Sequence, residues 1–229
     1  MLEKYIILSN GRTGSNWLAT TLSNMVQPTE PWFFDLSDWS QSLGPRVVLH
    51  THQADAVLAL DPEQAKKTTL IIARRYNLLD TAISHFVARY TDEWFHYSDR
   101  EFEPIAISHQ EMFLEITEAA GWHRGLRRKL NQSNYKNVVE ILFEDMVANR
   151  AQLEKFLANK LGLDYTALNQ QFDTPQQPSN SFRNPRQHHE IVKNYNQLKN
   201  MYGAQFIEDT WQKTGIEELT VTPKIWPAQ

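Results

Sequence analysis

Cysteine is absent from this chain of 229 residues. Without cysteine the protein has neither a disulfide framework nor a thiolate nucleophile. Long apolar runs are missing as well, since none approaches the roughly 20 residues that a membrane-spanning helix needs. No basic stretch precedes the first apolar segment, and we therefore expect no signal peptide. These absences predict a soluble, cytoplasmic protein without a membrane span.

The chain has no excess of positive charge. Its 23 Lys and Arg residues are outnumbered by 27 Asp and Glu residues, which gives a formal net charge of −4 at pH 7. Such a balance argues against a protein that coats nucleic acid or a membrane surface. An anionic ligand would have to be bound by arginines gathered at one place. We expect no nucleic acid among the partners.

What the chain does contain is an alternation of buried strands and amphipathic helices. Its hydrophobic share of 41% allows a sizeable core. Apolar runs predict four strands, at 5–8, 47–49, 69–73 and 138–143. Helical patterns lie between and after them, at 17–25, 53–67, 79–90, 108–130 and 153–161. This alternation predicts an α/β fold, a three-layer sandwich with a central parallel sheet.

No internal repeat and no long linker divides the chain, so we expect a single domain over residues 1–229. Two segments depart from the alternation. Residues 28–44 form a loop rich in aromatics, which suit either the core or an acceptor pocket. Residues 164–190 are rich in Gln, Asn and Pro and predict an irregular loop, with C-terminal helices at 191–214.

The segment between the first strand and the first helix has the composition of an anion site. Gly11 and Gly14 lack a Cβ, so the backbone can curl and direct successive N–H groups at one point. The helix start adds a partial positive charge. Ser15 and Asn16 add short donors, and Arg12 adds a guanidinium. We predict a phosphate or sulfate site here; the alternative is an ordinary turn that bends at its glycines.

Two observations argue against a metal ion. No Lys closes the glycine turn as in the nucleotide-triphosphatase loop, and the next acidic residue, Glu30, is poorly placed to hold magnesium. His50 and His52 could bind zinc, but a third ligand at matching spacing is missing. We therefore expect an anion bound by donors alone.

Polar side chains also follow the second and third predicted strands. His50 and His52 end the second strand, and Arg74 and Arg75 end the third. In a parallel sheet these ends share one edge with the first turn, and ligands bind at that edge. A neutral histidine there suits a general base, although a histidine can also cap a loop.

Arginine and serine next to the third strand predict a second anion site. Arg74 or Arg75, together with Ser84 on the following helix, can clamp a phosphate through guanidinium and hydroxyl donors. The arginine pair could instead be a solvated strand end. Arg183 and Arg186, in the predicted late loop, could close over the same ligand.

In this order the motifs resemble the sulfotransferase family that uses 3′-phosphoadenosine 5′-phosphosulfate. Residues 12–18 resemble its P-loop-like turn, and His50-Thr51-His52 is similar to its Lys-Thr-His motif. The run from Arg75 to Ser84 resembles its 3′-phosphate motif but is one residue longer than usual. Arg74 therefore remains an alternative to Arg75 as the arginine that binds the 3′-phosphate. Residues 143–146 and the helix that ends at 161–163 resemble a later strand and helix more weakly.

The resemblance implies a co-substrate and a division of roles. The donor is 3′-phosphoadenosine 5′-phosphosulfate, the product is 3′,5′-ADP, and no metal is required. Its 3′-phosphate would lie between Arg75 and Ser84, with Trp17 stacked on the adenine. The phosphosulfate would be bound by the turn, whose residues are Gly11, Arg12, Thr13, Gly14, Ser15 and Asn16.

The same resemblance implies three catalytic residues, His52, Arg12 and His50. His52 would take the proton of an acceptor hydroxyl or amine, and Arg12 would stabilise the leaving phosphate. Arg12 and His50 both stand where many members of the family have Lys. The acceptor would be a small molecule or a carbohydrate. Its identity and the oligomeric state are not indicated by the sequence.

Two other classes of function fit the same residues. A P-loop-type phosphotransferase or kinase would require magnesium and would bind ATP more tightly than 3′,5′-ADP. A catalytically inactive nucleotide-binding protein would bind 3′,5′-ADP and transfer no sulfate.

Overall fold

The computed structural model describes residues 3–26, 36–41, 46–92, 103–148, 150–163 and 188–213. These residues form two compact units. The first takes its described residues from Met1–Arg74 and Lys129–Gln177, and the second from Arg75–Arg128 and Pro178–Leu219. A single domain over 1–229 stays a prediction.

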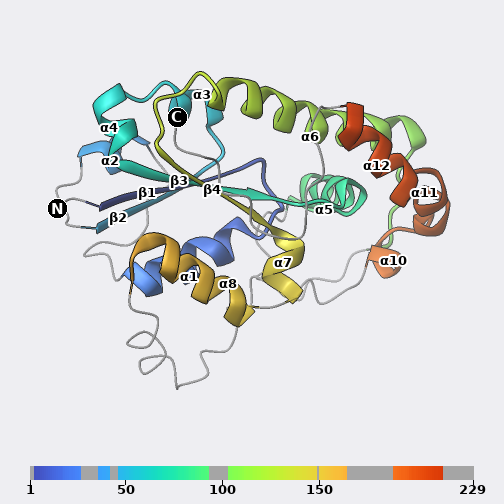
Figure 1. Cartoon of the computed structure of the whole chain (residues 1–229). Helices are drawn as coiled ribbons and strands as arrows, with labels where there is room; N and C mark the ends of the chain where they lie inside the picture. Colours follow the sequence, from blue (N-terminus) through green and yellow to red (C-terminus); the bar gives the residue numbers. More distant parts are fainter. Residues whose placement is uncertain are drawn as a thin grey trace. The chain divides into compact units, whose positions relative to one another are not determined.

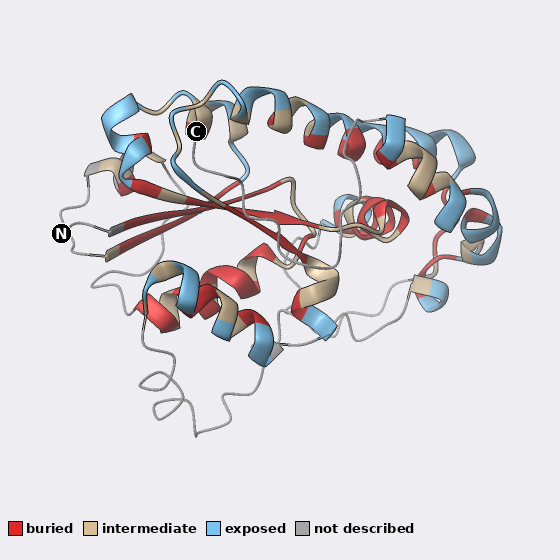
Figure 2. Ribbon diagram, in the orientation of Figure 1, coloured by how far each residue is buried: buried red, intermediate tan, exposed pale blue. Residues whose placement is uncertain are grey.

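A parallel sheet is the centre of the first unit (Figure 1). Its four strands lie in the order β2-β1-β3-β4, and the predicted α/β fold is confirmed. Most residues of the strands are buried, because helices cover both faces of the sheet (Figure 2). The strands are β1 (Glu3–Ser9), β2 (Arg46–Thr51), β3 (Thr68–Arg74) and β4 (Asn137–Leu142).

The register aligns the carboxyl ends of the strands. Leu8 of β1 pairs with Thr51 of β2, and Ser9 pairs with Ala73 of β3. The chain passes from β1 to β2 on one side and returns to β3 on the other, so the strand order reverses between β1 and β3. Such a reversal point is where open α/β sheets bind ligands.

Helices of the first unit lie on both faces of the sheet (Figure 1). One face carries α1 (Ser15–Val26), α7 (Phe143–Ala148) and α8 (Arg150–Leu161). The opposite face carries α3 (Ala54–Leu58) and α4 (Pro62–Lys66). Asp61 accepts hydrogen bonds from the amides of Glu63 and Gln64 and so caps α4, as an Asp-Pro pair at a helix start predicts.

The expected loop at 28–44 contains a helix, α2 (Leu36–Gln41). This helix was not predicted from local sequence periodicity, because a long-range contact stabilises it. Trp39 is fully buried, and the Lys4 ammonium lies 4.7 Å from its ring centroid and 3.0 Å from the carbonyl oxygen of Ser40. Trp39 is therefore a core residue, whereas Trp32, Phe33 and Phe34 lie outside the described residues.

A second difference lies at the end of β4. Phe143 begins α7, where the sequence predicts the last residue of a strand. The next two residues, Glu144 and Asp145, place carboxylates in the first turn of a helix, and these interact favourably with its amide end. The strand thus ends one residue early, and Phe143 is turned toward the first βα turn.

The second unit is a set of helices around its own core. The core joins residues far apart in sequence, among them Ile83, Ile116 and Trp211. Ser108 and Glu111 form the predicted capping box, each accepting a hydrogen bond from the other's backbone amide. The helices are α5 (Leu78–Thr91), α6 (His109–Leu130), α10 (His188–Ile191), α11 (Tyr195–Met201) and α12 (Ala204–Lys213).

The predicted loop at 164–190 lies outside the described residues up to 187. Helix α10 begins at His188, so the C-terminal helices begin three residues earlier than predicted. In the described ranges no helix is both long enough and apolar enough to cross a membrane.

Candidate functional site

The turn between β1 and α1 has an unusual backbone. Gly11, Arg12 and Gly14 all adopt positive φ, at 87°, 54° and 71°. Glycine adopts this region without cost, but for arginine the left-handed conformation is uncommon and costs on the order of 1–3 kcal/mol. Such strain concentrates at functional sites, and a turn with left-handed residues can direct neighbouring N–H groups into one concavity.

Gly14 is required for a second reason. A Cβ at this position would lie 2.7 Å from Cδ2 of Phe143 and 3.1 Å from Cε of Met146. Both side chains come from α7, which follows the last strand of the sheet. The turn therefore lies directly against α7, a contact that ties its shape to residues 129 and 132 positions away in the chain.

The first turn of α1 supplies donors for an anion. The first hydrogen bond of the helix joins the Leu18 amide to the carbonyl of Gly14, at 3.1 Å. The amides of Ser15 and Asn16 precede it and have no carbonyl partner inside the helix. Thr13 is fully buried, and its Oγ1 has no hydrogen-bond partner among the described residues. An anion in the turn would satisfy such groups, so the residues present fit a phosphate or sulfate.

His52 lies beside the turn with one ring nitrogen fixed. Its Nδ1 is 3.0 Å from the carbonyl oxygen of Ser9 and 2.9 Å from the Ser9 hydroxyl. A carbonyl oxygen can only accept, so Nδ1 of the neutral ring carries the proton and Nε2 is left as a proton acceptor. The side chain is exposed, as a group that takes a proton from a substrate must be.

His50 lies in a different environment although it is only two residues away. Its side chain is 2% exposed, and its Nε2 is 2.8 Å from the hydroxyl of Ser15. Burial, followed by the charge of His52, lowers the pKa of His50 to about 3. The ring is therefore neutral at physiological pH. It contacts His52 edge to face, with ring centroids 5.1 Å apart.

Ser9 joins the two histidines into one network. Its hydroxyl donates to the hydroxyl of Ser15 at 3.1 Å, and it also contacts Nδ1 of His52. Sequence reasoning missed Ser9, because its role depends on the strand register that places the end of β1 beside the end of β2. The first turn, His50 and His52 are thus brought together as the sequence predicted.

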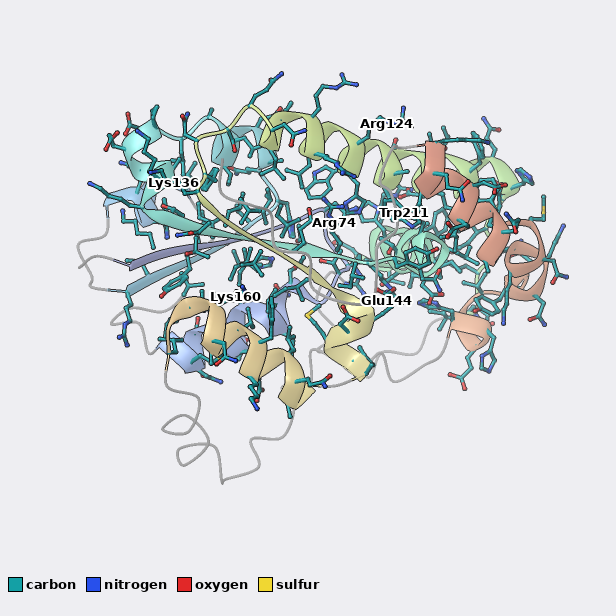
Figure 3. The ribbon with its side chains drawn as sticks, viewed as in Figure 1. Arg74, Arg124, Lys136, Glu144, Lys160 and Trp211 are labelled. Carbon is teal, nitrogen blue, oxygen red and sulfur yellow. The ribbon has the colours of Figure 1, made fainter. Side chains whose placement is uncertain are left out.

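Arg74 is held inside the sheet (Figure 3). Its Nη2 donates to Oε1 of Glu140 on the neighbouring β4, at 2.6 Å, and the two side chains are 1% and 6% exposed. Burial of a charge is costly unless it is paired, and this geometry supplies the pairing. Arg74 is therefore neither a solvated strand end nor an open cation.

Arg75 belongs to the second unit, where it contacts Asp80. Its Nη2 lies 3.1 Å from Oδ2 of Asp80, which also accepts from the Asn77 side chain at 2.9 Å. Nδ1 of His188 lies 3.0 Å from the other carboxylate oxygen. Burial alone would raise the pKa of Asp80, but the His188 hydrogen bond and the charge of Arg75 outweigh it and lower that pKa. His188 is a neighbour that the sequence did not indicate.

Four predicted binding residues remain, and the structure describes two of them. Ser84 lies on α5 with a buried side chain, and Trp17 lies on α1 and is also buried. Arg183 and Arg186 lie outside the described residues. Among the described residues no three His, Asp or Glu side chains form a group that could hold a metal ion.

Comparison with solved structures gives matches over nearly the whole chain. A sulfotransferase from Alicyclobacillus acidocaldarius is 15% identical, with a TM-score of 0.51 and coverage of 96% of this chain and 98% of that one. The sulfotransferase domain from the curacin biosynthetic pathway is 14% identical, with a TM-score of 0.46 and coverage of 95% and 99%. No protein-family model and no curated protein matches the sequence.

The first of these similarities identifies the fold. At an identity of 15% the two proteins share an architecture, a parallel sheet flanked by helices, over almost their full lengths. The chain accordingly has a sulfotransferase fold. Fold alone does not determine chemistry, which has to be argued from the side chains of the site.

Proposed function

We propose that the protein is a sulfotransferase that moves the sulfuryl group of 3′-phosphoadenosine 5′-phosphosulfate to the hydroxyl or amine of a small-molecule or carbohydrate acceptor. The observation that carries the proposal is an exposed histidine, oriented by Ser9, beside a left-handed anion turn. The fold shared with a solved sulfotransferase supports it. When bound, the nucleotide supplies the sulfuryl group, and the bond between sulfur and its bridging phosphate oxygen breaks as the acceptor–sulfur bond forms.

His52 is the general base in this proposal. Nε2 takes the proton of the acceptor while Nδ1–H remains bonded to the Ser9 carbonyl. That bond fixes both the tautomer and the plane of the ring, and it also stabilises the imidazolium that forms. A positioned base of this kind contributes roughly a hundredfold to ten-thousandfold in rate.

The turn binds the phosphosulfate and stabilises the charge that develops on the leaving phosphate. The amides at the start of α1 are donors that the helix fixes before the reaction begins, and Arg12 of the same turn adds a guanidinium. Losing one such donor commonly costs on the order of 3 kcal/mol of barrier. Arg12 stays charged throughout, so it acts through its field and not by giving up a proton.

The 3′-phosphate is assigned to Arg75, which precedes α5, and to Ser84, which lies within that helix. Arg75 carries a bidentate donor group, and Asp80 holds that group in place. Arg74 is 1% exposed and paired with Glu140 inside the sheet, whereas Arg75 is 13% exposed, and this difference favours Arg75 for the role. Trp17 is assigned to the adenine, as the resemblance implies.

Two measurements test the proposal. Calorimetry should show 3′,5′-ADP binding more tightly than 5′-AMP or ATP, with and without a chelator. A labelled-sulfate assay over a panel of sugars, phenols and amines should show transfer that His52→Ala abolishes while 3′,5′-ADP binding persists. Tighter binding of ATP with a strict magnesium requirement would instead identify a phosphotransferase. Nucleotide binding without any transfer would identify an inactive binding protein.

A further inference from the structure

Four side chains at the end of the sheet form a continuous line of hydrogen bonds. Nδ1 of His52 contacts the Ser9 hydroxyl, Ser9 contacts Ser15, and Ser15 contacts Nε2 of His50. The three distances are 2.9, 3.1 and 2.8 Å. The proposed reaction uses His52 and the turn, and it leaves the role of His50 open.

The direction of the first two hydrogen bonds follows from the donors around Ser9. Its hydroxyl oxygen lies 3.4 Å from the amide of Gly11, which can only donate, and 2.9 Å from Nδ1 of His52, whose one proton is shared between this oxygen and the Ser9 carbonyl. A hydroxyl accepts two hydrogen bonds and donates one. The Ser9 proton is therefore directed to the oxygen of Ser15.

Ser15 then has two ways to complete its hydrogen bonds. Its own proton can go to Nε2 of His50, or Nε2–H of His50 can donate to Ser15 and leave the Ser15 proton for another acceptor. An anion in the turn decides between them, because a hydrogen bond to a charged oxygen is roughly twice as strong as one to a neutral ring nitrogen. Ser15 is the first residue of α1, beside the amides that bind the anion.

We propose that His50 is a positioning residue whose Nε2–H group donates to Ser15, so that Ser15 donates its own proton to the anion bound in the turn. This inference rests on the proposed function for the identity of that anion. Ser15 receives donors from both Ser9 and His50, and hydrogen bonds arranged in series in this way strengthen one another. His50 supplies a donor without supplying a charge.

The neutrality of His50 follows from its surroundings. It is 2% exposed and lies 5.1 Å from the ring of His52. An imidazolium there would lose its hydration and would repel His52 once that residue had taken a proton.

Imidazole nitrogen spectroscopy tests the inference on the unmodified protein. Long-range proton–nitrogen spectra of the labelled full chain distinguish a protonated from a bare Nε2. With 3′,5′-ADP or inorganic pyrophosphate bound, Nε2 of His50 should carry the proton. A bare Nε2 in the anion-bound protein would overturn the inference whether or not the chain transfers sulfate.

Variants supply a second readout. His50→Leu and Ser15→Ala should each weaken 3′,5′-ADP binding roughly tenfold, because Ser15→Ala removes the charge-assisted hydrogen bond to the anion and His50→Leu removes the donor that orients it. The double variant should bind no more weakly than Ser15→Ala. His50→Gln, whose amide can donate in place of Nε2–H, should stay within about threefold of wild type. His123→Leu, a buried histidine in the second unit, is the matched control and should bind normally.

The outcomes separate the two proposals. Normal binding by His50→Leu, with folding verified by its melting curve, would overturn the positioning role and leave the sulfotransferase proposal in place. Binding of pyrophosphate with a protonated Nε2, but no binding of 3′,5′-ADP, would overturn the sulfotransferase proposal alone. Binding of neither anion would overturn both.

Discussion

At the scale of single residues, His50 and His52 take different roles because their environments differ, although they are only two positions apart. His52 is exposed and has its tautomer set by a backbone carbonyl, whereas His50 is buried. The spacing predicted that both would point to the same side, and they contact neighbouring groups: His52 the end of β1 at Ser9, and His50 the start of α1 at Ser15. It could not predict their exposure, which depends on the helix that covers one of them.

His50 makes the stability of the fold depend on pH. The unfolded chain binds a proton at His50 below pH 6.5, but the folded chain does not until about pH 3. The unfolded state therefore binds more protons in this window, and stability rises with pH there. Between pH 6 and pH 4 the wild type should lose up to about 1.4 kcal/mol per pH unit more than His50→Gln. Urea unfolding at several pH values measures this, and parallel curves would contradict it.

Arg75 should discriminate between two nucleotides. Removing its guanidinium deletes charge-assisted hydrogen bonds to a 3′-phosphate and changes nothing at the 5′ end. Arg75→Ala should therefore weaken 3′,5′-ADP roughly tenfold to a hundredfold and 5′-AMP by less than threefold. Asp80→Asn serves as the control, since it keeps the guanidinium but removes the charge that holds it. Equal losses for both nucleotides would reject the assignment of the 3′-phosphate to Arg75.

At the scale of elements, the first turn combines local and distant constraints. The glycines and the helix start were readable from sequence because left-handed backbone and amide donors are local properties. The contact of Gly14 with Phe143 was not readable, since it depends on β4 ending one residue early and α7 beginning there. The same limit applies to Arg74, whose partner Glu140 lies on a strand 66 residues later.

Alanine substitutions separate these two constraints on the turn. Gly11→Ala meets nothing within 4 Å and should cost only the left-handed backbone, about 1–2 kcal/mol. Gly14→Ala adds the clash with Phe143 and should cost about 1–3 kcal/mol more. Gly121→Ala, inside α6 with open space around it, should be neutral or stabilising. Denaturant unfolding ranks the three, and similar values for both turn variants would show that α7 moves aside freely.

At the scale of the whole molecule, the prediction of one domain has a direct test. Trp211 closes the core of the second unit: it is 2% exposed, and it donates from Nε1 to the carbonyl of Tyr76 at 2.9 Å. Trp211→Ala should cost about 3–5 kcal/mol. If the chain is one domain, the variant should melt in a single transition at lower temperature, with β-sheet and helix signals lost together. Two separated transitions would show two domains.

The sequence by itself determined the four strands, their parallel arrangement and the glycine turn, because burial, periodicity and backbone freedom are written in short stretches of chain. It also determined that His50, His52 and the turn would meet, since the carboxyl ends of parallel strands share an edge. Only the tertiary structure decided which histidine is buried, which arginine is paired within the sheet, and that Ser9 links the two rings. Burial and hydrogen-bond direction depend on residues that are close in space but distant in the chain, and a local sequence pattern cannot predict them.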